Sequence, residues 1–243
     1  MNIEKKKSIE LLKADLLAHF KESSAPTYQP LYFSELRDVK TSLNAEHFYK
    51  KFKIIFKYID ADLTNKSVID VGANAGFFSF AVAERKAMVD ALEPADRYYK
   101  LCKKLTEIYD VANVNCINAP LSLELINNKK YDYGFMLSVF QWISEGNNKL
   151  SYALNLLNEI SKHVDVLFFE LGCNAGKSAV TTKKFNHLAY VYSLLKNNTV
   201  YKNIKLIGTT SIWRRRPRYL FMCSHEDINA REPWYAFLKR MSI

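Results

Sequence analysis

The sequence contains no apolar run that approaches the roughly 18 residues needed for a membrane-spanning helix. Its lysine-rich first residues are not followed by the hydrophobic core of a signal peptide. The four cysteines are widely spaced, with no C-x-x-C pair and no histidine neighbour at metal-ligand spacing. We therefore expect a cytoplasmic protein with buried free thiols and no metal site.

Glycine is also scarce, with seven residues in the whole chain, and two of them fall in one short stretch. Residues 68–71 form a β-branched run that predicts a buried strand, and an apolar helix is expected from 77 to about 83. Gly72 and Gly76 lie between the two. A backbone without Cβ atoms lets a ligand approach closely, with the N–H groups of the helix start pointing at it. The stretch predicts a ligand-binding turn, although an ordinary tight turn has the same pattern.

The overall composition favours a packed globular protein, because 49% of the 243 residues are hydrophobic and 14% are aromatic. The formal net charge is +10. Such a charge suits an anionic partner, whether RNA, a phosphorylated glycan or an acidic membrane face. Many basic chains bind none of these, so the charge alone leaves the partner open.

Helical spacing of apolar residues predicts two amphipathic helices near the start, over residues 2–20 and 44–59. We interpret the lysines of the second helix as its solvated side: Lys50, Lys51, Lys53 and Lys57. The predicted organisation is an N-terminal helical extension over residues 1–60 and one domain over residues 61–243. The terminal segment 230–243 mixes aromatic and basic side chains, which is typical of a membrane- or partner-binding surface and equally of a tail packed on its own domain.

Beyond the glycine turn, strand and helix patterns alternate. Such alternation predicts an α/β fold with a doubly wound, mostly parallel sheet. Two further strands, expected to pair antiparallel, bring the total to seven. The predicted strands are residues 68–71, 88–93, 114–118, 131–138, 166–170, 204–208 and 219–223.

An acid ends the second predicted strand, where Glu93 lies 23 residues after Asp70 (93 − 70). A carboxylate at this place can accept the ribose hydroxyls of a nucleoside lying across the strand ends. The alternative is a surface carboxylate before Pro94. The spacing favours a nucleoside-containing ligand.

The turn reads Asp-x-Gly-x-Asn-x-Gly, which lacks the G-x-G-x-x-G spacing of dinucleotide sites. It instead resembles motif I of class I S-adenosylmethionine (SAM) methyltransferases. The resemblance implies SAM as cofactor, with Trp142 covering the adenine or filling the core, and with Tyr28 and Gln29 against the methionine end or in the core. The cofactor residues implied are Tyr28, Gln29, Asp70, Gly72, Asn74, Gly76, Phe77, Glu93, Asn118, Ala119, Ser138 and Trp142.

A narrower resemblance rests on five segments in the same order and with similar gaps: Tyr28-Gln29, residues 70–79, 137–143, 206–208 and 216–220. Together they resemble the methyltransferase part of bacterial O-antigen chain-terminating methyltransferase/kinases. That family usually has two histidines where this chain has Gln141 and Trp142, and we expect no kinase domain to follow. A separate kinase or glycosyltransferase is therefore an expected partner. Residues 137–143 are also similar to RNA 5′-phosphate methyltransferases.

The resemblance implies methyl transfer to an oxygen on the terminal sugar or terminal phosphate of a surface polysaccharide, at the inner face of the cytoplasmic membrane. A phosphate oxygen needs no base, whereas a sugar hydroxyl does, and Glu170 and His187 are the candidate catalytic bases. Arg216 and Arg218 are the candidate acceptor-binding residues, since guanidinium groups bind phosphate in a bidentate way. Two alternatives stay open, an RNA methyltransferase and a non-catalytic module that keeps the SAM-binding fold.

Overall fold

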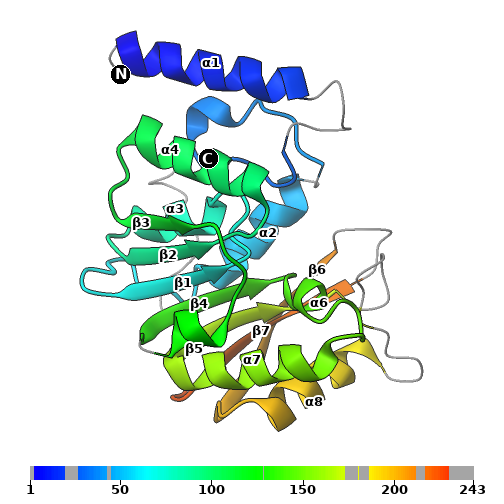
Figure 1. The fold of residues 1–243 in the computed structure, drawn as a ribbon. Coiled ribbons are helices and arrows are strands. Elements are labelled where there is room, and N and C mark those ends of the chain that lie inside the picture. The colour runs from blue at the N-terminus through cyan, green and yellow to red at the C-terminus, as the bar shows by residue number, and fades with distance from the viewer. Residues whose placement is uncertain are drawn as a thin grey trace. The chain divides into compact units, whose positions relative to one another are not determined.

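The computed structural model describes residues 3–19, 27–42, 45–127, 129–172, 180, 186–211 and 217–229. Its strands form a seven-stranded sheet in the order β3-β2-β1-β4-β5-β7-β6 (Figure 1). Strands β1, β2 and β3 pair in parallel with one another, and β4 pairs in parallel with β5, whereas β6 and β7 add the antiparallel part. The predicted α/β class, with a mostly parallel sheet and an antiparallel ending, is therefore confirmed.

The chain packs as two compact units, one of Met1–Phe48 with Leu63–Pro120 and one of Tyr49–Asp62 with Leu121–Ile243. This division differs from the predicted extension over residues 1–60 and domain over 61–243. The predicted boundary stays a prediction.

In the first unit, β1 (Ser67–Val71), β2 (Met88–Leu92) and β3 (Val114–Ile117) pair in parallel. The near-continuous apolar run of β1 is typical of a parallel strand that is covered on both faces. Every residue of the helix α3 (Phe77–Ala83) is buried, and Ser79 is its one polar side chain. A helix with apolar residues all round is typical of a core, so α3 lies in the core directly after the glycine turn. The helix α4 (Asp96–Tyr109) then leads to β3.

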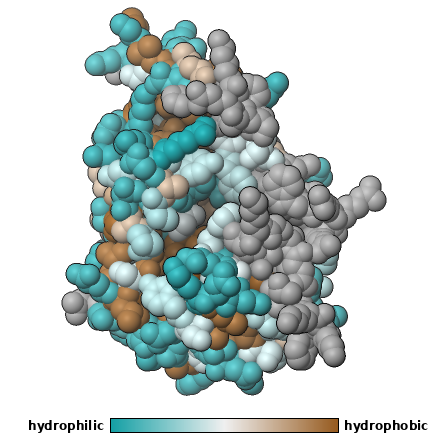
Figure 2. Space-filling model, turned by 45° about the vertical axis from the view of Figure 1, so that its right-hand side comes forward, coloured by the Kyte–Doolittle hydropathy of each residue, from teal (hydrophilic) through white to brown (hydrophobic). Residues whose placement is uncertain are grey.

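The N-terminal helix α1 (Ile3–His19) lies across α4 at the top of Figure 1, and Lys104 Nζ meets Asp15 Oδ2 at 2.9 Å. Its predicted apolar stripe is buried through Ile9, Leu12 and Leu16. The helix also has exposed apolar side chains, so hydrophobic and hydrophilic residues alternate at the top of Figure 2. The 3-10 helix η2 (Ser34–Leu36) follows within residues 27–42.

The second unit contains β4 (Tyr131–Leu137) paired in parallel with β5 (Val164–Glu170), and β5 paired antiparallel with β7 (Pro217–Ser224). The edge strand, β6 (Asn203–Ser211), pairs with β7. The remaining helices are α2 (Ala45–Ile55), which runs from the first unit into the second, α5 (Leu123–Ile126), α6 (Phe140–Ile143), α7 (Leu150–His163) and α8 (His187–Asn198).

Among the residues that the structure describes, no helix is both long and apolar enough to cross a membrane. The predicted membrane- or partner-binding segment 230–243 lies outside the described residues.

Candidate functional site

The glycine turn of the first unit is held open by three residues with left-handed backbone: Gly72 (φ 70°), Asn74 (φ 54°) and Gly76 (φ 80°). The N–H groups of Gly72 and Ala73 donate to the carbonyl oxygen of Leu92 at 2.8 and 2.9 Å. These two bonds tie the end of β1 to the end of β2. The turn therefore has a fixed shape at the carboxyl edge of the strands, where doubly wound sheets bind ligands.

Gly76 is required by packing as well as by its backbone angle. A Cβ placed there would lie 2.7 Å from Cys102 Sγ and 2.8 Å from the ring of Phe80. Because both distances are shorter than real contacts, any side chain would push the turn away from α3 and α4. This explains why one of the chain's few glycines immediately precedes Phe77.

Glu93 connects the turn to the end of β2. Its Oε2 accepts from the N–H of Asn74, and its Oε1 accepts from the N–H of Ala95, both at 2.8 Å. The side chain is buried, and this burial raises its pKa, while the two backbone hydrogen bonds act in the opposite direction. Glu93 thus organises the turn, and its remaining lone pairs leave room for the predicted contact with ribose hydroxyls, which stays a prediction.

Asn74 supplies a sign that the turn is built for a ligand. Only 7% of the residue is exposed, and its Oδ1 has no hydrogen-bond partner among the described residues. A buried acceptor left unpaired costs about 1–3 kcal/mol. An amino or hydroxyl donor of a bound molecule would satisfy it, so this atom fits a cofactor with the polar groups of SAM.

Asp70, at the end of β1, is buried behind the turn and accepts from Ser79 Oγ at 2.7 Å. Burial raises its pKa to about 7, the hydrogen bond from Ser79 opposes the rise, and the charge of Glu93 adds to it. The unfolded carboxyl group has a pKa near 3.9, so folding favours the protonated form.

This shift predicts a pH dependence of stability. The contribution of Asp70 is fully present below pH ~4, is lost as the pH rises toward about 7, and amounts to at most ~4 kcal/mol. Asp70→Asn cannot ionise and keeps an oxygen for Ser79, so its melting temperature should fall less than that of the wild type between pH 5 and pH 8. Thermal unfolding followed by circular dichroism measures this. Asp165→Asn, at an exposed position, serves as the control and should follow the wild type. Parallel profiles for Asp70→Asn and the wild type would contradict the assignment.

The other predicted cofactor residues of the first unit lie in the segment 27–42 and at the end of β3. Tyr28 and Gln29 are half-buried in the segment 27–42, which reaches the start of α3 where the ring of Tyr32 packs edge-on against Phe77 (centroids 5.4 Å apart). Asn118 Nδ2 donates to the carbonyl oxygen of Glu93 at 3.0 Å, so it joins the ends of β2 and β3. Ala119 follows it at the same end. Their contacts with SAM stay predictions.

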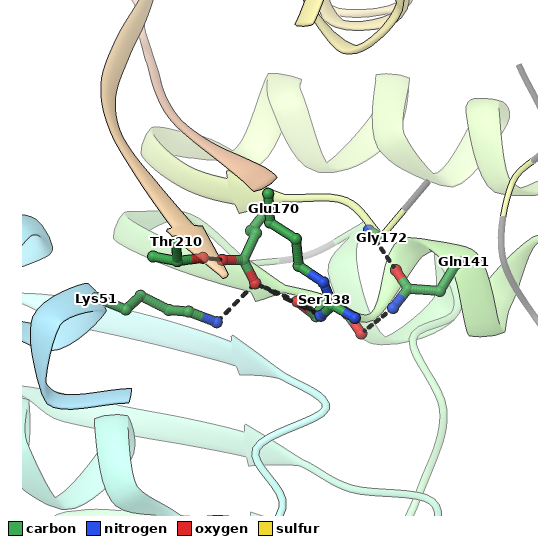
Figure 3. Close-up of polar contacts among 7 residues, drawn as sticks. Lys51, Ser138, Gln141, Glu170, Gly172 and Thr210 are labelled. Atoms are coloured by element: carbon green, nitrogen blue, oxygen red, sulfur yellow. Dashed lines mark hydrogen bonds and ion pairs between the residues drawn. The ribbon is translucent and has the colours of Figure 1, made fainter. Parts of the chain in front are cut away.

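In the second unit, polar groups from four other parts of the chain converge on Glu170, the last residue of β5 (Figure 3). Lys51 Nζ lies 2.6 Å from Glu170 Oε2, and Thr210 Oγ1 donates to Oε1 at 2.6 Å. Ser138 Oγ donates to the same Oε2 and accepts from Arg218 Nη1 at 2.7 Å. We refer to Lys51, Ser138, Glu170, Thr210 and Arg218 as the Glu170 cluster.

The Glu170 cluster has two cations and one carboxylate. Burial acts to raise the pKa of Glu170, but the charges of Lys51 and Arg218 outweigh it and hold the pKa below its usual value. For Lys51 burial dominates and lowers the pKa, although Glu170 opposes this. With all three groups charged, the cluster has a net charge of +1, which favours an anion as ligand.

The position of Lys51 corrects one prediction. Lys51 stands among other lysines and is therefore predicted to lie on the solvated side of the helix, yet its side chain is only 5% exposed. The helical spacing contained the signal, because Lys51 lies three residues after Phe48 and four before Ile55, both of which are buried. A lysine within an apolar stripe needs a buried partner, and that partner is Glu170.

Two residues beside the cluster fix its geometry. Gln141 is buried, donates from Nε2 to the carbonyl oxygen of Ser138 at 2.8 Å, and accepts at Oε1 from the N–H of Gly172 at 3.4 Å (Figure 3). A Cβ on Gly172 would lie 3.3 Å from Arg218 Nη2. Ser138 has a left-handed backbone with φ 61°, which is uncommon outside glycine and is concentrated at functional sites.

The remaining predicted site residues are Trp142, His187 and Arg216. Trp142 on α6 is 67% exposed, so the alternative that it fills the core is wrong. His187 opens α8, and none of the contacts described for Glu170 involves it. Arg216 lies outside the described residues. Across the part of the chain that the structure describes, no group of three or more metal-ligating side chains occurs.

Comparison with known proteins identifies the fold. No protein-family model matches the chain, and a comparison with curated proteins finds no match. Among solved structures, the bifunctional kinase-methyltransferase WbdD is 17% identical with a TM-score of 0.70, over 90% of this chain and 49% of that one. The N-terminal domain of EvdMO1 with S-adenosylhomocysteine (SAH) bound is 13% identical, with a TM-score of 0.63 over 93% of this chain and 98% of the other.

Magnesium protoporphyrin IX methyltransferase (ChlM) from Synechocystis PCC 6803, with bound SAM, is 18% identical, with a TM-score of 0.56 over 74% of this chain and 80% of that one. The chain thus has the class I methyltransferase fold. It spans about half the length of the WbdD chains that it matches.

Proposed function

We propose that this protein is a SAM-dependent methyltransferase that holds SAM at the glycine turn of its first unit. The observation that carries the proposal is the turn itself, where buried Glu93 fixes the backbone of Asn74 and the Asn74 Oδ1 is left for a ligand donor. Two proteins of similar fold were solved with SAH or SAM bound, which supports the same cofactor here.

When bound, SAM supplies an electrophilic methyl group on a sulfonium sulfur. The chain's own residues would then bind and orient this cofactor. Glu93 would accept ribose hydroxyls, the left-handed turn at Gly72 and Gly76 would admit the ligand to the backbone, and Asn74 would accept a hydrogen bond from the amino acid part. Holding two reactants at attack distance can supply much of the rate in such a transfer.

We further propose that the acceptor is an oxygen at the end of a surface polysaccharide, on a terminal phosphate rather than a terminal sugar hydroxyl. A hydroxyl needs a base, and both oxygens of Glu170 are already engaged by Lys51, Thr210 and Ser138 in a fully buried site. A phosphate oxygen is already anionic and suits the net positive charge of the Glu170 cluster. Arg218, with 12% of its side chain exposed, is its most accessible cation.

The experiment has two steps on the full chain. Calorimetric titration of SAM and SAH tests the cofactor, with tight binding expected. Transfer of the labelled methyl group from SAM is then measured on glycan ends with and without a terminal phosphate, and on RNA with a 5′-phosphate. RNA is included because the net charge of +10 suits an anionic polymer. We expect transfer to the phosphorylated glycan alone.

Arg218→Gln should lower transfer to that acceptor about 100-fold, since loss of a buried charged hydrogen-bond partner costs about 2–5 kcal/mol. Its affinity for SAM should be unchanged. Arg37→Gln, at an exposed position of the first unit, is the control and should behave as wild type. A well-folded chain that binds no SAM would show that it is a non-catalytic module, and transfer to unphosphorylated glycan or only to RNA would overturn the acceptor.

A further inference from the structure

Two cysteines that are separate in the sequence meet beneath the glycine turn. Cys102 on α4 and Cys116 on β3 have their Sγ atoms 3.1 Å apart, within hydrogen-bond distance. Both are free thiols. A disulfide bond is about 2.05 Å long, so the sulfurs need to approach by only about 1 Å to form one.

Both thiols connect directly to the proposed cofactor site. Cys102 Sγ lies so close under the turn that a Cβ on Gly76 would be 2.7 Å from it. On the other side, Asn118 follows Cys116 by two residues and donates to the carbonyl oxygen of Glu93. A movement that draws the two sulfurs together therefore acts on groups directly beside the turn and beside the Asn118 hydrogen bond.

We propose that Cys102 and Cys116 form a reversible oxidation site, and that their disulfide weakens binding of SAM. The second half of this proposal rests on the proposed function, whereas the first half does not. The oxidant is a peroxide, and a dithiol reduces the bond again.

The chemistry balances with one peroxide molecule for each pair. The Cys116 sulfur attacks one peroxide oxygen, the O–O bond breaks, and water leaves once the departing oxygen is protonated. The Cys102 sulfur then attacks the sulfenic Cys116, so that the S–S bond forms, the S–O bond breaks and a second water leaves with the Cys102 proton. The two thiols lose two electrons in total, and the peroxide gains them.

Cys116 is suited to react first. It is half-buried, whereas Cys102 is 1% exposed. The hydrogen bond with Cys102 and the charge of Lys103 hold the pKa of Cys116 below its usual value, although burial opposes them. The hydrogen bond and burial raise the pKa of Cys102, so Cys102 is suited to the second, resolving step.

The test treats the full chain with hydrogen peroxide, maps the linked peptides by mass spectrometry and titrates SAM before treatment, after treatment and after dithiothreitol. We expect a Cys102–Cys116 linkage and an affinity for SAM lowered about tenfold, within the usual range of coupling between sites, with full recovery on reduction. Cys116→Ser should abolish both effects. Cys223→Ser, which changes a buried thiol of β7, should keep both.

Absence of the linkage in folded wild-type protein would overturn the oxidation site. A linkage that leaves SAM affinity unchanged would overturn its regulatory effect. If the reduced chain binds no SAM at all, the proposed function fails together with the regulatory effect, while the peptide map still decides the oxidation site.

Discussion

Glu93→Ala should abolish measurable binding of SAM, with an affinity at least about 100-fold below that of the wild type. The substitution removes the acceptor for the N–H groups of Asn74 and Ala95. Each buried donor left unpaired costs about 1–3 kcal/mol, and the acceptor for the ribose hydroxyls is lost at the same time. Calorimetric titration of SAM measures the change.

The controls for this variant separate binding from folding. Glu124→Ala makes the same substitution at an exposed position of α5 and should bind SAM as the wild type does. Glu93→Gln keeps the shape of the side chain but offers an amide nitrogen to one of the two N–H groups. Its affinity for SAM should therefore lie between that of Glu93→Ala and that of the wild type. If folded Glu93→Ala, verified by circular dichroism, bound SAM with wild-type affinity, the nucleoside site would not be at this turn.

Lys51→Met should destabilise the fold strongly. It leaves Glu170, with 0% exposure, charged and without its closest cation, and breaking a buried pair from one side typically costs about 3–5 kcal/mol. For a chain of this size each kcal/mol lowers the melting temperature by about 2–4 °C. We therefore expect a decrease of roughly 10 °C in a thermal unfolding experiment.

The matched control is Lys149→Met, which removes an exposed ion pair with Glu145 and should change stability by less than about 1 kcal/mol. The double variant Lys51→Met/Glu170→Gln removes both charges and should recover part of the loss, because no uncompensated carboxylate is left buried. A melting temperature for Lys51→Met within about 2 °C of that of Lys149→Met, a difference worth about 1 kcal/mol or less, would show that the buried pair does not stabilise the fold.

The Glu170 cluster also bears on the question of a catalytic base. Glu170 is a candidate base from the sequence because methyl transfer to a sugar hydroxyl needs one. Its full burial and its bonds to Lys51 and Thr210 suit a positioning role instead, in which it holds Ser138 and Arg218 in place. This is why the proposed acceptor is one that needs no base.

The sequence by itself determined the features that depend on short stretches of chain. The glycine turn could be predicted because the backbone angles at Gly72 and Gly76 require residues without a Cβ. Glu93 could be predicted as a neighbour of the turn because consecutive parallel strands end at the same edge of the sheet. The order of strands and helices followed from their different periods.

Only the tertiary structure decided which distant side chains meet. Lys51 and Glu170 are separated by 119 positions, and Thr210 reaches Glu170 across 40. Such contacts depend on strand pairing and helix packing. The helical spacing could show that Lys51 lies on the buried side of its helix, but no local pattern shows that Glu170 is its partner. The same holds for Cys102 and Cys116, because spacing along the chain cannot show that α4 packs its thiol onto β3.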